Sequence, residues 1–125
     1  MNKNYLQVAA LLAALSVALG AFGAHGLKSI VSEQSLITYE TGVRYQFYHV
    51  FALFITGILY REQHAGAFRI AYWLFITGII LFSGSLYLLA VLAPEYRFLG
   101  AITPFGGVAF IAGWVQLMLA VRKKD

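Results

Sequence analysis

Four long apolar stretches, separated by short polar ones, dominate the 125-residue chain. They cover residues 6–24, 45–60, 70–91 and 104–121. An α-helix needs roughly 20 residues to cross the hydrocarbon core of a bilayer, with about 17 to 25 tolerated. The first and third stretches meet this length, the fourth is marginal, and the second is short unless its helix begins earlier. Because backbone polar groups in lipid must be satisfied internally, the pattern predicts a single all-α domain, an integral membrane four-helix bundle.

Helix start and stop signals flank these stretches. Thr103 followed by Pro104 is typical of a helix start, because a proline at the first helical position leaves no N–H unpaired. Pro94 follows the third stretch, where it cannot extend the helix. Gly26 follows the first stretch and is expected to close that helix in the left-handed conformation.

The connection between the first two stretches, residues 25–44, is too long to be structureless in a compact bundle. Ser32 is a suitable N-cap for a helix over about 32–44, and Glu33 follows in the first turn, where the helix dipole favours an acid. We predict an additional amphipathic helix at the membrane surface here. It either turns near Gly42 or runs straight on into the second span, which would lengthen that short span.

Small residues recur at helical spacing, and such residues allow close helix packing in lipid, where no hydrophobic force brings helices together. The predicted packing positions are Ser16, Gly20 and Ala24 in the first span, Gly78 and Ser85 in the third, and Ala109 and Gly113 in the fourth. Each helix keeps apolar surface beyond these positions. The bundle is therefore expected to contact membrane lipids and to be capable of forming a homo-oligomer.

Composition and charge agree with a polytopic membrane protein, since 61% of the residues are hydrophobic and 11% are charged. The basic residues border the apolar stretches instead of forming a patch, so no nucleic acid partner is expected. Counting lysine and arginine on each side predicts that both termini are cytoplasmic in a bacterial inner membrane. Lys3, Arg61, Arg69, Arg122, Lys123 and Lys124 fall on the inner side, and Lys28, Arg44 and Arg97 on the outer side.

An alternative is that residues 1–23 form a cleaved signal peptide, because Ala21-Phe22-Gly23 resembles a cleavage site. However, the apolar run is longer than the usual signal-peptide core of about 7 to 15 residues. We therefore expect the segment to remain as the first span.

Polar and titratable side chains gather toward the outer half of the predicted bundle, where ionisable groups within the membrane are candidates for function. His49 shares one helical face with Tyr45 and is expected to point into the bundle. Glu40 and Arg44 are spaced favourably for an ion pair. The complete candidate cluster is His25, Glu40, Arg44, Tyr45, His49, Ser83, Ser85 and Thr103.

Three interpretations of this cluster stay open. In the first, which we favour, the groups satisfy one another and the helix ends, as interhelical polar contacts commonly do. In the second, the histidines form a small-ligand, ion or proton site. In the third, His25, His49 and Glu40 form a metal or catalytic site, although their spacing matches no known zinc motif. The chain has no cysteine, phosphate-binding loop or nucleophile motif, so we predict no enzyme activity, no metal and no cofactor. His64 is expected to be a solvated loop residue.

Four motifs together resemble a known family. They are GAFGAHGL at 20–27, YQFYH at 45–49, FSGSLY at 82–87, and LGAITPFGG at 99–107 followed by Gly113-Trp114. They are similar to the bacterial YgdD/YwdK-like family of small inner-membrane proteins, a family of unknown function, and the resemblance extends over essentially the whole chain. It implies four membrane helices and an uncleaved N-terminus, and it implies no activity and no catalytic residues.

These observations lead us to expect a structural or accessory membrane protein that packs with itself or with a larger complex. The alternative is a small channel, transporter or lipid- or ligand-binding protein that uses the outer polar cluster. The two hypotheses differ on whether His25 and His49 share a cavity.

Overall fold

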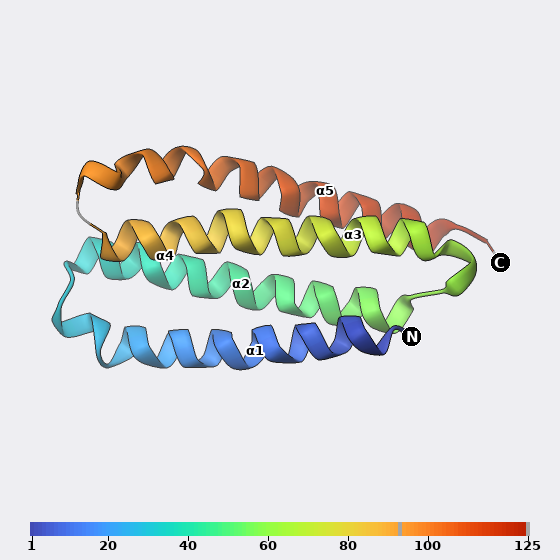
Figure 1. Ribbon diagram of the computed structural model, residues 1–125, viewed down its shortest axis with the longest axis horizontal. Coiled ribbons are helices and arrows are strands. Elements are labelled where there is room, and N and C mark those ends of the chain that lie inside the picture. Colours follow the sequence, from blue (N-terminus) through green and yellow to red (C-terminus); the bar gives the residue numbers. More distant parts are fainter. Residues whose placement is uncertain (93, 125) are drawn as a thin grey trace.

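The computed structural model describes residues 1–92 and 94–124, and all regular elements in this part of the chain are helical. The long elements are α1 (Lys3–Ala24), α2 (Glu33–Leu59), α3 (Ala65–Gly78), α4 (Gly84–Val91) and α5 (Thr103–Arg122). The short ones are η1 (Leu27–Ser29), η2 (Glu62–His64), η3 (Ile79–Ser83) and η4 (Pro94–Ala101). The long helices lie side by side, and the two chain termini lie at the same end of the bundle (Figure 1).

Three helical segments in the described chain are long and apolar enough to cross a membrane. They are Lys3–Ser29, Glu62–Val91 and Pro94–Arg122. The third predicted stretch belongs to a rod in which α3, η3 and α4 continue one another (Figure 1). Within this rod η3 is a π-helical segment, in which the N–H of Gly84 donates to the carbonyl of Ile79, five residues earlier. Such insertions are rare and widen one turn of a helix.

The α2 helix runs without a break over 27 residues, which is about 40 Å at 1.5 Å per residue. It begins where the sequence indicated, with the Oγ of Ser32 accepting a hydrogen bond from the N–H of Ser35 at 3.1 Å. Of the two predicted alternatives, the structure therefore has the helix that runs straight on into the second span, and not a separate surface helix over 32–44. The reason is packing, because Gly42 lies against the ring of Tyr87 on α4 and Tyr39 is buried.

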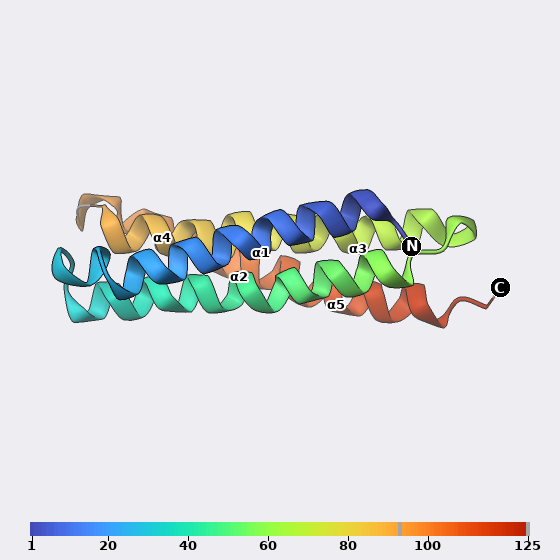
Figure 2. The same ribbon diagram turned by 90° about the horizontal axis from the view of Figure 1, so that it is seen from below.

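The α1 helix lies at the edge of the bundle and packs against α2 (Figures 1 and 2). Its buried residues are Ala9, Ser16 and Gly23, spaced seven apart. Seven residues make nearly two full turns, whereas each step of four rotates the helix face by about 40°. The stripe expected at Ser16, Gly20 and Ala24 is corrected accordingly. Gly20 is half-buried beside Val43, Ala24 is exposed, and Gly23 makes the contact instead.

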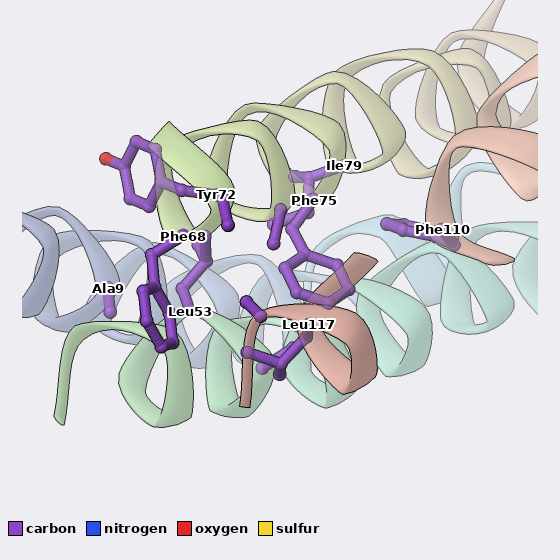
Figure 3. Close-up of a cluster of buried hydrophobic side chains, with 12 residues drawn as sticks. Ala9, Leu53, Phe68, Tyr72, Phe75, Ile79, Phe110 and Leu117 are labelled. Carbon is purple, nitrogen blue, oxygen red and sulfur yellow. The ribbon is translucent and has the colours of Figure 1, made fainter. Parts of the chain in front are cut away.

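The main hydrophobic core lies where α3 meets α5 and α2 (Figure 3). Phe68, Phe75 and Leu53 are fully buried there. Gly78, Ala109 and Gly113, which the sequence marked as packing positions, are buried at the α3–α5 contact. The ring of Phe110 lies directly over Gly78, and the ring of Phe75 lies over Gly113.

Two helix boundaries differ from expectation. Gly26 has a φ of −72°, so it is not left-handed, because the chain passes directly from α1 into the 3-10 turn η1. Thr103 is the first residue of α5 and not its cap, and Ile102 precedes it with helical backbone angles. Pro94 does follow the end of α4, as predicted, and begins η4.

Candidate functional site

His49 is the centre of the polar groups inside the bundle. It lies in the middle of α2, with 5% of its surface exposed, and its ring stacks on Phe110 of α5 with centroids 3.5 Å apart. A helix that began at residue 45 would place His49 about one turn inside. Because α2 begins at Glu33, His49 lies more than four turns inside the helix.

Both nitrogens of His49 are occupied. Nδ1 lies 2.7 Å from the backbone carbonyl of Tyr45, and a carbonyl can only accept, so Nδ1 carries the hydrogen. Nε2 accepts a hydrogen bond from the indole Nε1–H of Trp114 on α5 at 3.1 Å. These two partners select the neutral tautomer protonated at Nδ1. A proton on Nε2 would have to point at the indole N–H, which is itself a donor.

A second polar contact joins α1, α2 and α4. Gln46 is buried, and its Nε2 donates to the carbonyl of Leu12 at 3.2 Å. Its Oε1 accepts a hydrogen bond from the hydroxyl of Tyr87 at 2.6 Å. About two turns of α1 further on, the hydroxyl of Tyr39 donates to the carbonyl of Leu19 at 2.6 Å. These side chains bind α1 to its neighbours through its backbone carbonyls.

Two of the predicted hydroxyl positions, Ser85 and Thr103, join the α3–α4 rod to α5. The hydroxyls of Ser85 and Thr103 are 2.6 Å apart, and Ser85 Oγ also donates to the carbonyl of Phe82 at 2.9 Å. Ser83 is completely buried in the π-helical segment. Among the described residues, its Oγ is the buried side-chain polar atom without a hydrogen bond.

The remaining members of the predicted cluster do not join His49. His25, Glu40 and Arg44 are exposed, and no ion pair joins Glu40 to Arg44 in the described chain. Gly20 of α1 lies beside Val43 of the antiparallel helix α2, which places His25 level with about residue 38. His49 is about eleven residues further along, or about 16 Å at 1.5 Å per residue. His25 and His49 therefore share no cavity. Tyr45 is partly exposed and packs against Phe82 at 4.7 Å between centroids.

At the end of the bundle where the two chain termini lie, the segment after α2 contacts the C-terminal end of α5. Arg61 donates from its NH2 nitrogen to the carbonyls of Ala120, Val121 and Lys123 at 3.0–3.2 Å, at the C-terminal end of α5. A cation at this end is favourable because the helix dipole is negative there. His64 is bonded through Nε2 to the carbonyl of Lys124 at 3.0 Å, so it is not the freely solvated residue that was expected.

A family model described as "Protein of unknown function (DUF423)" matches residues 19–107. The chain is 44% identical over 122 residues to the UPF0382 membrane protein YwdK of Bacillus subtilis, a match that covers 97% of this chain and 98% of the relative. UPF0382 membrane proteins of Staphylococcus haemolyticus and Staphylococcus aureus are 42% and 43% identical over 121 residues, covering 97% of both chains in each case. This chain belongs to that family. No solved structure matches it.

Membership confirms the resemblance drawn from the motifs, and the relatives' names describe membrane proteins without an activity. The structure also shows three polar residues that the polar-cluster prediction left out. Gln46, Tyr87 and Trp114 all lie within the quoted motifs, yet only the structure shows them bonded to neighbouring helices. Their signal in the sequence was an amide, a phenol and an indole within otherwise apolar stretches, a kind of residue that needs a partner when buried.

The arrangement offers little room for chemistry. Among the described residues, no three His, Cys, Asp or Glu side chains lie close enough to share a metal ion. An open hollow of about 520 Å³ lies on the exposed side of α3 and is lined by Arg69, Ile70, Trp73, Leu74 and Thr77. It does not reach His49. The interpretation of His25, His49 and Glu40 as one metal or catalytic site therefore has no support in the geometry.

Proposed function

We propose that this protein is a structural or accessory protein of the bacterial cytoplasmic membrane, a four-span bundle with both termini in the cytoplasm that packs with itself or with a larger complex. The observation that carries this proposal is the closed environment of His49. Its two nitrogens bind Tyr45 and Trp114, and Phe110 covers its ring. A histidine that relays protons or binds a substrate needs a free nitrogen facing a path, and His49 has none in this conformation.

The other interior polar groups support the same conclusion. Gln46, Tyr87, Ser85 and Thr103 bind one another or backbone carbonyls of neighbouring helices. In lipid such contacts are the ordinary means of holding helices together. These four polar residues are thus used for the assembly of the bundle itself.

We count α2 as the fourth span, although it is less apolar than the three segments named above. Its length of about 40 Å exceeds the roughly 30 Å hydrocarbon core. Its polar residues Gln46 and His49 are turned inward, and α1, the α3–α4 rod and α5 all pack against it. An even number of spans is also consistent with termini at one end of the bundle (Figure 1).

Cysteine labelling tests this topology directly, because the chain has no cysteine of its own. Ile30→Cys and Glu62→Cys introduce single thiols at the two ends of α2, both at exposed positions. With an impermeant maleimide on intact cells, we expect Ile30→Cys to be labelled and Glu62→Cys to need permeabilised cells. Labelling of both from the same side would mean that α2 does not cross.

The functional proposal is tested by His49→Ala. Loss of the indole and carbonyl contacts and of the ring stacked on Phe110 should lower stability in detergent by about 2 kcal/mol or more. Proton or ion flux through liposomes should equal that of empty liposomes for both wild type and variant. Wild-type flux that His49→Ala abolishes, while the unfolding temperature stays unchanged, would replace the structural proposal with a channel or transporter.

A further inference from the structure

The open hollow on α3, which we call the α3 groove, lies in the half of the bundle that contains the two chain termini (Figure 1). Its volume of about 520 Å³ falls within the roughly 300–1,000 Å³ that is usual for ligand sites. The lining residues all belong to α3 and follow one side of the helix: Arg69, Ile70, Trp73, Leu74 and Thr77. From Arg69 to Thr77 the groove extends about 12 Å along the helix axis, at 1.5 Å per residue.

The chemistry of the groove changes along its length. Arg69 stands at the end nearer the termini, it is exposed, and no carboxylate among the described residues pairs with it. Trp73 follows one turn further in, is 57% exposed, and has no hydrogen-bond partner for its indole N–H within the described chain. Arg61 differs from Arg69, because its guanidinium is bonded to the last carbonyls of α5. The groove therefore offers an unpaired cation and a free donor beside apolar side chains.

The depth of Arg69 suits a lipid headgroup. The apolar segment Glu62–Val91 is about 45 Å long at 1.5 Å per residue, whereas the hydrocarbon core is roughly 30 Å thick. A centred core leaves about 7–8 Å of the segment outside the hydrocarbon at each end. Arg69 lies about 10 Å from Glu62, close to the boundary between hydrocarbon and headgroups. Helix side chains also tilt toward the N-terminus, which here is the surface end, and the tilt carries Arg69 and Trp73 toward the headgroups.

A phospholipid presents its groups in the same order, with the phosphate at the surface, the glycerol esters next and the acyl chains in the hydrocarbon. A guanidinium binds phosphate oxygens through two parallel hydrogen bonds, and an indole N–H can donate to an ester carbonyl. The described lining contains no acid that would bind the ammonium group of a zwitterionic lipid. Bases also outnumber acids at this end, so an anionic headgroup is favoured. The sequence places there Lys3, Arg61, Arg69, Arg122, Lys123 and Lys124 against Glu62 and Asp125.

We propose that the α3 groove binds one anionic phospholipid, with its phosphate on Arg69, an ester carbonyl on the indole of Trp73 and an acyl chain extending toward Thr77. The lipid belongs to the leaflet at this end of the bundle, which is the cytoplasmic leaflet in the proposed topology. The site goes beyond the proposed function. It needs α3 to span the membrane, as that proposal holds, but it needs no partner protein and no second copy.

Quenching by brominated lipids tests the selectivity, because the chain has two tryptophans that can be read separately. The protein is reconstituted in phosphatidylcholine vesicles with a minor fraction of lipid brominated on its acyl chains, either phosphatidylglycerol or phosphatidylcholine. The Trp73 signal, taken as the difference between wild type and Trp73→Phe, should show at least a fivefold preference for phosphatidylglycerol. Trp114, the indole that remains in Trp73→Phe, should show none. Equal quenching of Trp73 by the two lipids would overturn the proposal.

Arg69→Gln should reduce the preference to less than twofold, because the phosphate loses its charged partner. The matched control is Arg122→Gln, which removes a positive charge from an exposed position at the same end but outside the groove. It should leave the preference within twofold of wild type. Equal loss in both variants would mean a general attraction to a basic surface and would overturn the site. The wild-type comparison of the two lipids needs no variant, so it decides the matter even if Arg69→Gln does not fold.

Thr77→Phe tests the acyl chain, because it places a ring in the inner end of the groove. We expect it to lower the preference at least threefold, whereas Ile80→Phe, at an exposed position outside the groove, should change it little. No effect of Thr77→Phe, together with competition by inorganic phosphate in solution, would show a phosphate site without a lipid chain and overturn the proposal. The labelling and flux experiments read topology and His49 independently of this groove. Failure of the lipid site is thereby distinguished from failure of the proposed function.

Discussion

Two helix contacts in this molecule are built in different ways. Where α1 meets α2, few residues of α1 are buried, and long polar side chains of α2 cross the contact and bind backbone carbonyls of α1. Tyr39 binds the carbonyl of Leu19, and Gln46 binds that of Leu12. Where the α3–η3 segment meets α5, glycines receive aromatic rings or backbone directly. Gly78 faces Phe110, and Gly106 faces the backbone of Phe82.

The difference shows two solutions to one problem. Helices in lipid gain no hydrophobic energy by associating, so they depend on close van der Waals packing or on hydrogen bonds. The α3–α5 contact uses shape, and it should tolerate no added atom where backbone approaches glycine. The α1–α2 contact uses several hydrogen bonds of modest strength, and it should weaken gradually as they are removed.

Gly106→Ala should have the largest effect. A methyl group there would lie 2.7 Å from the Cα of Phe82, and backbone cannot move aside as a side chain can. We expect a loss of about 2–3 kcal/mol, measured as a lower unfolding midpoint in detergent. The neighbouring Gly107→Ala is the matched control, because the nearest atom to its added methyl is 3.9 Å away. Equal destabilisation by both would show that glycine flexibility, and not close contact, matters here.

Gly23→Leu should come next and test the corrected stripe on α1. Its Cβ would lie 2.6 Å from Cε1 of Tyr39, so the ring must move and its hydrogen bond to Leu19 is lost. We expect about 1–3 kcal/mol of destabilisation. Ala24→Leu, at the exposed neighbouring position, should stay within about 0.5 kcal/mol of wild type. The reverse order would restore the stripe read from the sequence.

Gln46→Met should have a smaller effect, because it keeps the volume and removes two hydrogen bonds. It leaves the hydroxyl of Tyr87 buried without its partner, and we expect a cost of about 1–2 kcal/mol. Tyr87→Phe should cost a similar amount, and the double variant clearly less than the sum. Additive losses would mean that the 2.6 Å contact between these side chains contributes nothing of its own.

The sequence predicted the helices well where lipid alone decides the pattern. The stretches 6–24 and 104–121 fall within α1 and α5, and 70–91 falls within the rod from Ala65 to Val91. Apolar length is sufficient there because any helix in lipid must be apolar outside. The sequence could not show that α2 is continuous from Glu33, because the early turns of α2 mix charged and apolar residues as a surface helix would.

The site was harder to predict for a related reason. Helical periodicity predicts the face on which His49 lies but not the helix that this face contacts. The hydrogen bond between His49 and Trp114 of α5 could therefore not be predicted from the sequence. The depth of His49 also depended on where α2 begins. Because α2 starts at Glu33, His25 and His49 lie far apart, and the cluster that the sequence placed in one outer layer divides into interior and exposed residues.

Tyr39→Phe should have the smallest effect and sets the lower limit of the comparison. It removes the hydroxyl bond to Leu19 but keeps the ring that packs on Gly23 and Tyr87. The carbonyl of Leu19 retains its N–H partner within the helix, so no buried acceptor is left unpaired. We expect about 0.6 kcal/mol or less, the average for interhelical hydrogen bonds in membranes, read as a small shift of the unfolding midpoint. A loss of 2 kcal/mol or more would mean that this one bond holds the edge helix, and the two contacts would then be equally intolerant of change.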